Sequence, residues 1–589
     1  MSRGLLSEGR TIADDELDLA IRLVLRTGMH DVVDEWIADY RRAQGLRGGG
    51  RPRTLHPAVV VAIIIVLHLQ GTPPHIKQVA AVITRLSDDQ RMRLGIRRDD
   101  VASPGQWYER VRRSWDGFVD AIDPFPKVPT HRRPTVAEYE EARRVTERDP
   151  HTAVRAERLT RFANLLIDAS LYEVPEAYRP SAYAVAYDAT VLRVFARGIG
   201  KARKKLLGPD DKLSSEPEAS FYAREREDHF DDGKLPLSKV THGYELDLLV
   251  GMHPDPDRTR EAPILTLGVA HHRPGVAIND HARAVFENVR SRGHDIAVVG
   301  ADRAYLPGSK EDVLQGYLYD AGIRVVMDYR KDQLGIQAQH GGAIMVDGTW
   351  FCPAMPEELV NLGREWAEAR ERADRSAEAG EPIPDIDFTE RFEMRKKFAL
   401  RRKQGRNPNG STTMMCPAVG RSATVWCDHK PHEPKGRGKL PILNPPHAPG
   451  DICNNRTSMT IPRDASNGKA LKYGQTYAYG TAEWAKHYGR RNVVESFNAY
   501  IKGAKGMKLD NPADYRMRGR ASKFLLAAVG VVAANLLKID AFLAEREHEH
   551  MPAHLRPSKT RRATLRQQLN HYRKTVERQQ RLAAASVDT

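Results

Sequence analysis

The stretch AYAVAYDATVLRVFAR, residues 182–197, decides the fold, because it opens a series of β-rich runs in a chain that looks helical up to that point. The next two runs are YELDLLVGMH (244–253) and APILTLGVAHH (262–272). A capped helix at 279–293, a strand at 295–306 and, after another helix, a strand at 323–330 follow. Three strands followed by helix, strand, helix and strand predict a mixed α/β sheet.

The residues before this sheet are predicted to be helical. An apolar run at 58–69 is too short for a membrane span of about 20 residues and predicts a buried helix. With the GTPP break and the amphipathic segment after it, this run fits either a helix-turn-helix or an ordinary helical hairpin. We therefore assign 1–125 to an all-α domain, with a role in binding DNA ends under the first alternative, and 126–180 to a Pro-rich linker and a helix.

Residues 335–480 interrupt the sheet pattern. They contain short β-like pieces, a charged helical stretch, many prolines and all four cysteines, which predicts a β-rich insertion. The α/β domain then comprises 181–334 and 481–545, and the apolar run at 524–537 predicts a helix that packs back onto it. A basic segment at 546–589 is either a solvated tail or a DNA contact.

Charge and cysteine content restrict the class of protein. The chain has 92 Lys and Arg against 77 Asp and Glu, a formal net charge of +15, which favours a polyanionic partner and nucleic acid first. The N-terminal sequence lacks the apolar core of a signal peptide, and four cysteines are too few for a disulfide framework. We expect a cytoplasmic protein that does not act in a membrane.

Two carboxylates follow apolar strand sequences. Asp188 comes after YAVAY and Asp302 after IAVVGA, where burying an acid is costly unless it is solvated or has a function. Asp168 competes for the first position but has a more helical context, and Asp328 competes for the second. If the first and fourth predicted strands are neighbours in the sheet, Asp188 and Asp302 meet.

A later stretch, YGRRNVVESFNAYIK (488–502), carries polar residues at helical spacing. On a continuous α-helix, Tyr488, Arg491, Glu495 and Lys502 lie within roughly 60° of one another, and Asn498 lies about 20° from Arg491 on the same face. The adjoining face carries an apolar stripe that would pack onto a core: Val494, Phe497 and Ile501. The polar stripe is therefore expected to face outward.

A helix laid across the sheet would add Glu495 to the two aspartates. Three hard oxygen ligands are the set that Mg²⁺ or Mn²⁺ prefers, and two such ions clamp the attacking and leaving oxygens of a phosphodiester displacement. Arg491 lies one turn from Glu495 and Lys502 about two turns from it, so both can meet phosphates.

These residues resemble a known family. Tyr488-x2-Arg491-x3-Glu495-x6-Lys502 is similar to the YREK signature of bacterial insertion-sequence transposases of the DDE type, and the segments YDAT (187–190) and ADRAYL (301–306) look like those of the family's two aspartates. The resemblance covers roughly 180–540. It implies an RNase H-like fold, metal binding by Asp188, Asp302 and Glu495, and contacts from the three other signature residues to the phosphates of the element's ends. Asn498, on the same helical face, is predicted as an additional DNA contact that the signature does not include.

The cysteines leave two readings open. Cys352, Cys416, Cys427 and Cys453 lie within about 100 residues, and two histidines, His429 and His432, stand near the third. No CxxC pair is present and the spacings are irregular, so buried free thiols are favoured over a structural zinc site.

The resemblance implies a cut-and-paste DNA transposase. It would hydrolyse the phosphodiester at the boundary of an insertion sequence, and the freed 3′-hydroxyl would then attack target DNA. Its partners would be double-stranded DNA, as terminal inverted repeats and as target, and a second copy of the chain when two ends are joined, in the bacterial cytoplasm at the nucleoid. Two alternatives remain: a metal-dependent nuclease or resolvase of the same fold, and a non-catalytic DNA-binding protein derived from a transposase.

Overall fold

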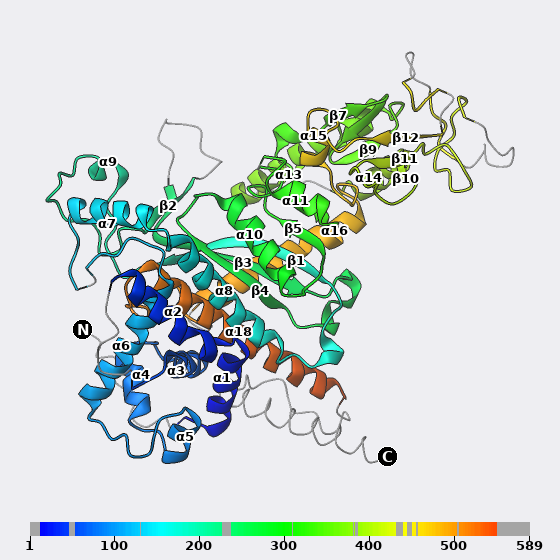
Figure 1. The fold of residues 1–589 in the computed structure, drawn as a ribbon. Helices are drawn as coiled ribbons and strands as arrows, with labels where there is room; N and C mark the ends of the chain where they lie inside the picture. Colours follow the sequence, from blue (N-terminus) through cyan, green and yellow to red (C-terminus); the bar gives the residue numbers. More distant parts are fainter. Residues whose placement is uncertain are drawn as a thin grey trace, which may run out of the picture.

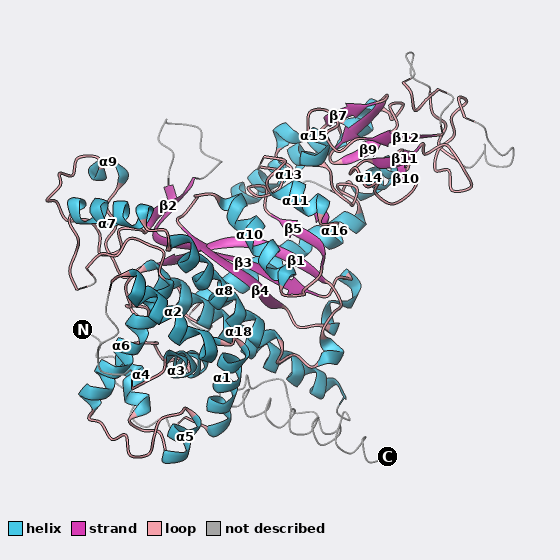
Figure 2. Cartoon of the chain, viewed as in Figure 1, coloured by secondary structure: helices cyan, strands magenta, loops and turns pink. Residues whose placement is uncertain are grey.

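The chain folds into a helical part, a central mixed sheet and an arm that projects from the sheet (Figures 1 and 2). The computed structural model describes residues 12–45, 54–129, 131–225, 237–308, 310–380, 382, 387–430, 440–444, 450–454, 457–503 and 506–550. Most of the predicted basic segment at 546–589 lies outside the described residues. The described helices, sheet and arm follow one another in this order along the chain.

The helical part precedes the sheet. Its helices are α1 (Asp14–Arg26), α2 (Met29–Ala43), α3 (Pro57–Leu69), α4 (Ile76–Ile83), α5 (Asp88–Arg93), α6 (Pro104–Ile122), α7 (Val136–Arg148) and α8 (Thr152–Leu171). Because α3 has no polar face, it is buried on every side, with nearly all of its residues inaccessible to solvent. The predicted buried helix at 58–69 is confirmed.

The central sheet consists of β1 (Tyr183–Arg193), β2 (Ser220–Glu225), β3 (Leu237–Met252), β4 (Leu265–His272), β5 (Ile296–Ala301) and β6 (Arg324–Val326). Strand β1 is antiparallel to β3 on one side and parallel to β5 on the other, and β5 is parallel to β6. Strands β2 and β4 both pair antiparallel with β3. Helices α10 (Ile278–Ser291) and α11 (Leu314–Asp320) connect the parallel strands. The mixed α/β sheet is confirmed, whereas β2 and the first residues of β3 were not predicted.

Two helices close the outer edge of β4. The side-chain amide of Asn164 on α8 accepts from the Val269 N–H (2.9 Å) and donates to the Val269 carbonyl (3.0 Å). Asn535, on α18 (Arg520–His550), makes the same two bonds with Thr266, both at 2.9 Å. Each amide thus replaces one residue of a neighbouring strand, which satisfies backbone groups that would otherwise be buried without a partner.

Helix α18 contains the apolar run at 524–537 and runs between the helical part and the sheet (Figure 1). It is long and apolar enough to cross a membrane, but 89% of its apolar window is buried against the rest of the chain. It contacts α8, α3 and β4, so the helices before the sheet and the sheet itself share one hydrophobic core. The prediction that this helix packs back onto the α/β domain is confirmed.

The insertion forms the arm, which holds two small antiparallel sheets and several helices. Its strands are β7 (Ile336–His340), β8 (Ala343–Val346), β9 (Thr349–Phe351), β10 (Arg401–Arg402), β11 (Thr412–Met415) and β12 (Ser458–Ile461). Its helices are α12 (Glu357–Val360), α13 (Leu362–Ala379), α14 (Thr389–Lys396) and α15 (Lys469–Tyr473). The insertion is therefore a mixture of strands and helices, in which α13 is the predicted charged helix.

After the arm the chain returns to the sheet through α16 (Ala482–Tyr488), a 3-10 turn η5 (Gly489–Arg491) and α17 (Asn492–Lys502). The predicted apolar stripe on this segment is confirmed, because Val494, Phe497 and Ile501 are at most 1% exposed. The remaining short elements are α9 (Lys201–Lys204) and the 3-10 turns η1 (Glu176–Tyr178), η2 (Pro256–Glu261) and η3 (Lys331–Gln333).

Candidate active site

The register of two parallel strands brings Asp188 and Asp302 together. In the ladder between β1 and β5, Tyr187 stands opposite Ala301. Asp188 and Asp302 are the next residue on each strand, and neighbouring strands lie about 4.8 Å apart. Asp302 directly follows β5, as predicted, whereas β1 continues past Asp188 to Arg193 by pairing with β3 alone. The two acids thus meet at the point where the ladder between β1 and β5 ends.

Helix α17 lies along β1 and reaches the same place. The Asn498 amide donates to Asp188 Oδ2 at 3.1 Å, and Lys502 Nζ donates to Thr190 Oγ1 at 3.1 Å. Four residues of an α-helix rise about 6 Å and two residues of a strand about 6.6 Å, so side chains at these intervals stay in step. Thr190 was not singled out from the sequence. It lies two residues after Asp188 on β1, so the two side chains are on the same face of the strand.

Glu495 enters the site one helical turn before Asn498, and Arg491 connects it to the sheet. An Arg491 guanidinium nitrogen lies 2.9 Å from Glu495 Oε1 and 4.0 Å from Asp302 Oδ1. The Asp302 and Glu495 side chains are about half exposed, at 50% and 51%, while Arg491 is 19% exposed. The three predicted acids therefore share one solvent-facing site, with a cation held between two of them.

The electrostatics of Asp188 reflect this clustering. The pKa of its carboxyl is raised from 3.8 to about 7, mainly by burial and also by the nearby carboxylates of Asp302 and Glu495. The Ala189 N–H and the Arg491 guanidinium oppose that increase in the pKa. Asp188 is thus a half-buried acid whose ionised form is only partly compensated by the protein.

Tyr488 borders the site. Its ring stacks on Trp484 of α16, with ring centroids 4.8 Å apart, and the Arg491 guanidinium lies 5.8 Å from its ring centroid. Burial raises the pKa of the Tyr488 hydroxyl to about 12, so it stays protonated and able to donate a hydrogen bond.

The stripe predicted on one continuous α-helix is divided between two helices. The 3-10 turn η5 separates Tyr488, at the end of α16, from Glu495 and Lys502 on α17. Asn498 was expected on the outward face but is only 7% exposed, because its amide points at Asp188. The outward face thus consists mainly of Glu495, with Arg491 and Lys502 half-buried beside it.

The two competing aspartates occupy ion pairs elsewhere. Asp168 on α8 lies 2.9 Å from Arg292 and 2.6 Å from His294. Asp328, which follows β6, lies 2.5 Å from Arg303 and accepts a hydrogen bond from the Tyr479 hydroxyl at 2.8 Å. Both carboxylates are buried with cationic partners, which is the arrangement of a structural acid.

The three carboxylates are suitable ligands for a hard divalent cation, but they are not arranged around one point. Among the described residues, no three His, Cys, Asp or Glu side chains are placed to hold a metal ion as they stand. The carboxylates of Asp188, Asp302 and Glu495 are nevertheless oxygen donors, and their mutual repulsion helps to raise the pKa of Asp188. Arg491 offsets part of that negative charge, so it has to move before a cation can bind between Asp302 and Glu495.

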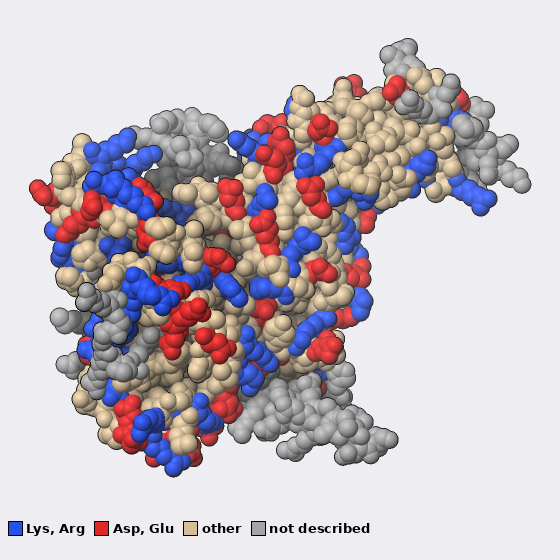
Figure 3. All heavy atoms as spheres, in the orientation of Figure 1, with Lys and Arg blue, Asp and Glu red and all other residues tan. Residues whose placement is uncertain are grey.

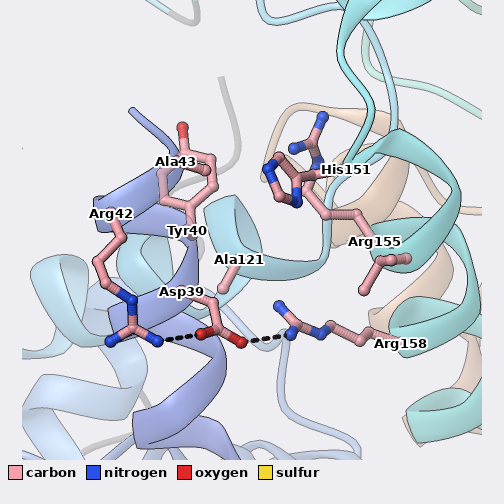
Figure 4. Close-up of a pocket in the computed structure, with 9 residues that line it drawn as sticks. Asp39, Tyr40, Arg42, Ala43, Ala121, His151, Arg155 and Arg158 are labelled. Atoms are coloured by element: carbon pink, nitrogen blue, oxygen red, sulfur yellow. Dashed lines mark hydrogen bonds and ion pairs between the residues drawn. The ribbon is translucent and has the colours of Figure 1, made fainter. Parts of the chain in front are cut away.

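A cavity in the helical part and the distribution of surface charge are weaker candidates for a functional site. A cavity of about 450 Å³ between α2, α6 and α8 is lined by arginines (Figure 4), but Asp39 bridges Arg42 and Arg158, and Arg155 pairs with Asp149. On the face in Figure 3, basic and acidic side chains are interspersed rather than gathered into one basic stripe.

No family model, curated protein or solved structure matches the chain. The assignment of the site therefore depends on its geometry and on the residues of its sequence motifs.

Proposed function

We propose that this protein is a DDE transposase that moves an insertion sequence by cutting and joining DNA, and that its central sheet has the RNase H-like fold. One observation carries the proposal: the register of β1 and β5 places Asp188 beside Asp302, and α17 adds Glu495 from a distance of more than 190 residues in the sequence. A structural role alone does not account for Asp188, an acid whose pKa is raised by burial and by two further carboxylates at a solvent-facing site.

Asp188, Asp302 and Glu495 would hold Mg²⁺ or Mn²⁺. Two such ions, when bound, supply Lewis-acid stabilisation of the attacking and leaving oxygens of a phosphodiester. Asn498 fixes the orientation of the Asp188 carboxylate through the 3.1 Å hydrogen bond.

Arg491 has two candidate partners in this function. In the free protein it neutralises Glu495 and Asp302. A DNA phosphate, like a carboxylate, accepts two parallel hydrogen bonds from a guanidinium, so it can compete with the half-exposed carboxylates for Arg491. Binding of an element end would then draw Arg491 toward the backbone and free the carboxylates. Lys502 and the protonated hydroxyl of Tyr488 flank the same opening and would contact neighbouring phosphates.

The decisive experiment is cleavage of a duplex that carries the ends of the element encoding the protein, with Mg²⁺ or Mn²⁺ present. We expect cleavage at the boundary followed by joining to a target duplex. Glu495→Gln should reduce cleavage by more than about 100-fold while DNA binding is retained, because it removes an ionised ligand without changing side-chain size.

The matched control is Glu287→Gln on α10, where an exposed glutamate pairs with Arg283 at 2.8 Å away from the acids. This variant should cleave normally. Cleavage without joining would favour a nuclease or resolvase, and specific binding without cleavage would favour a non-catalytic DNA-binding protein. Cleavage that survives Glu495→Gln would contradict the assigned site.

A further inference from the structure

Four cysteines that are scattered along the sequence come together in the arm. Cys352 follows β9, Cys416 follows β11, and Cys427 and Cys453 lie in the loops between β11 and β12. All four are free of disulfides and buried, with 5–8% of each residue exposed, and all belong to the same apolar core.

Backbone hydrogen bonds join the first two cysteine segments through β10 and β11. The Cys352 N–H donates to the Phe398 carbonyl at 3.0 Å, just before β10. Strand β10 pairs with β11, where Arg401 stands opposite Met415, the residue before Cys416. The Cys416 N–H in turn donates to the Thr457 carbonyl at 3.0 Å, which lies four residues after Cys453.

A buried lysine joins the other two segments. The Lys430 N–H donates to the Cys427 carbonyl at 3.0 Å and closes a turn at that cysteine. Lys430 Nζ donates to the carbonyls of Ile452 (2.7 Å) and Asn454 (2.8 Å), the two residues on either side of Cys453. The turn at Cys427 therefore rests directly on the turn at Cys453.

Burial disfavours the ionised form of these thiols, and nearby backbone N–H groups oppose that effect only in part. Cys352 and Cys416 each begin a Cys-Pro-Ala turn. Burial raises the pKa of the Cys352 thiol to about 12 and also raises the pKa of Cys416, but the Ala354 and Ala418 N–H groups lower these two pKa values. The cysteines are close enough that each of the six pairs contributes to a thiol pKa.

Two basic side chains, Lys430 and Arg401, lie beside the cysteines. Lys430 is only 6% exposed and lowers the pKa values of Cys416 and Cys453, whose burial acts in the opposite direction. The Arg401 guanidinium donates to the Cys416 carbonyl at 3.3 Å. Four thiolates around one divalent ion carry a net charge of −2, which a buried ammonium and a guanidinium would offset.

We propose that Cys352, Cys416, Cys427 and Cys453 bind one structural zinc ion that holds the arm together. Four soft thiolate donors in a closed, tetrahedral set are characteristic of structural zinc. The thiols are not arranged around one point in the structure, so zinc binding requires the four side chains to turn toward a common centre. The site is separate from the three acids, and the inference does not depend on the proposed function.

Metal analysis of the purified full-length chain, produced with zinc available, tests this directly. We expect about one zinc per chain, and four thiols that react with a thiol reagent only as the zinc is released. Cys416→Ser should lose most of the zinc and lower the melting temperature. Glu495→Gln should keep the zinc, which separates this site from the proposed catalytic one.

A second measurement covers the case in which Cys416→Ser does not fold. The wild-type chain reconstituted with Co²⁺ should show the visible absorption of tetrahedral thiolate-bound cobalt, and Zn²⁺ should displace it while Mg²⁺ does not. The proposal is overturned by a folded wild-type chain that lacks zinc and exposes four titratable thiols, by iron in place of zinc, or by a Cys416→Ser variant with unchanged zinc content.

Discussion

At the scale of single residues, the site contains a carboxylate whose ionisation the fold opposes. The Asp188 carboxylate accepts a hydrogen bond from Asn498 at 3.1 Å and has two neighbouring acids, whose effect the Ala189 N–H and the Arg491 guanidinium oppose. Burial and the neighbouring negative charges both favour the neutral form of Asp188. A bound cation would stabilise the ionised form instead and so remove this unfavourable free energy. This property belongs to the position of Asp188 between β5 and α17, not to aspartate itself.

Asp188→Asn should stabilise the metal-free protein at neutral and alkaline pH. The pKa of Asp188 is about 7 in the folded chain against 3.8 for an ordinary aspartate, so the folded state holds its proton more tightly than the unfolded state. The wild type therefore loses stability relative to the variant as pH rises from about 4 to about 7, and the difference levels off above that, at a few kcal/mol at most. The melting temperatures of the wild type and the variant across this pH range, with chelator present, measure this difference in stability. A difference that stays constant with pH would contradict the shifted pKa.

Arg491→Gln should change metal binding and DNA cleavage in opposite directions. Without the guanidinium 2.9 Å from Glu495, Mn²⁺ should bind several-fold more tightly to the DNA-free protein, because a competing cation is gone. Cleavage of element ends should fall, since a phosphate contact is lost. Titration with Mn²⁺ and the cleavage assay measure the two effects. Arg283→Gln, which removes the exposed pair with Glu287 and the contact with the Tyr317 ring, is the control and should change neither.

At the scale of elements, the edge strand β4 is closed by side chains instead of another strand. Asn164 and Asn535 each pair with both backbone groups of one β4 residue, and Arg520 donates to the His271 carbonyl at 3.0 Å. Helices α8 and α18 can therefore lie against the edge without leaving its polar groups unpaired. This arrangement anchors α18, and through the contact of α18 with α17 it supports the helix that carries Glu495.

Asn535→Leu should destabilise the chain by about 2–4 kcal/mol, because it leaves the buried N–H and carbonyl of Thr266 without a partner at nearly unchanged side-chain volume. Denaturant unfolding of the two proteins measures the loss. Asn492→Leu, at an exposed position at the start of α17, is the control and should change stability by less than about 0.5 kcal/mol. Equal effects of the two substitutions would show that the β4 edge does not need the amide.

At the scale of the whole molecule, the helices before the sheet do not form a separate core. Helix α3 contacts α18, α1 contacts α8, and the buried residues of these helices and of the sheet form one cluster. The arm projects from the sheet (Figure 1) and contains a buried ion pair, Arg395 with Asp347 at 2.5 Å, although its buried apolar residues belong to the same cluster. The boundary predicted at residue 125 therefore separates segments of sequence that fold against each other.

A fragment that begins at residue 126 should be insoluble or aggregate when produced alone. Removing the first helices uncovers the part of α18 that contacts α3 and α6, within a helix whose most apolar stretch is 89% buried in the whole chain. The measurement is the soluble fraction on expression and the sedimentation profile, compared with a chain that ends at residue 550 but keeps those helices. A soluble, monomeric fragment would contradict the shared core.

The sequence by itself determined the order of the elements, the apolar helices α3 and α18, the mixed sheet and the apolar stripe of α17, because these depend on periodicity within a few residues. It also singled out Asp188, Asp302 and Glu495. Only the tertiary structure decided that Arg491 lies between two acids, that Asn498 is buried against Asp188, and that the four cysteines meet. These contacts are between residues up to about 300 positions apart in the sequence, for instance Asn498 and Asp188. They follow from strand register and helix packing, which local sequence does not encode.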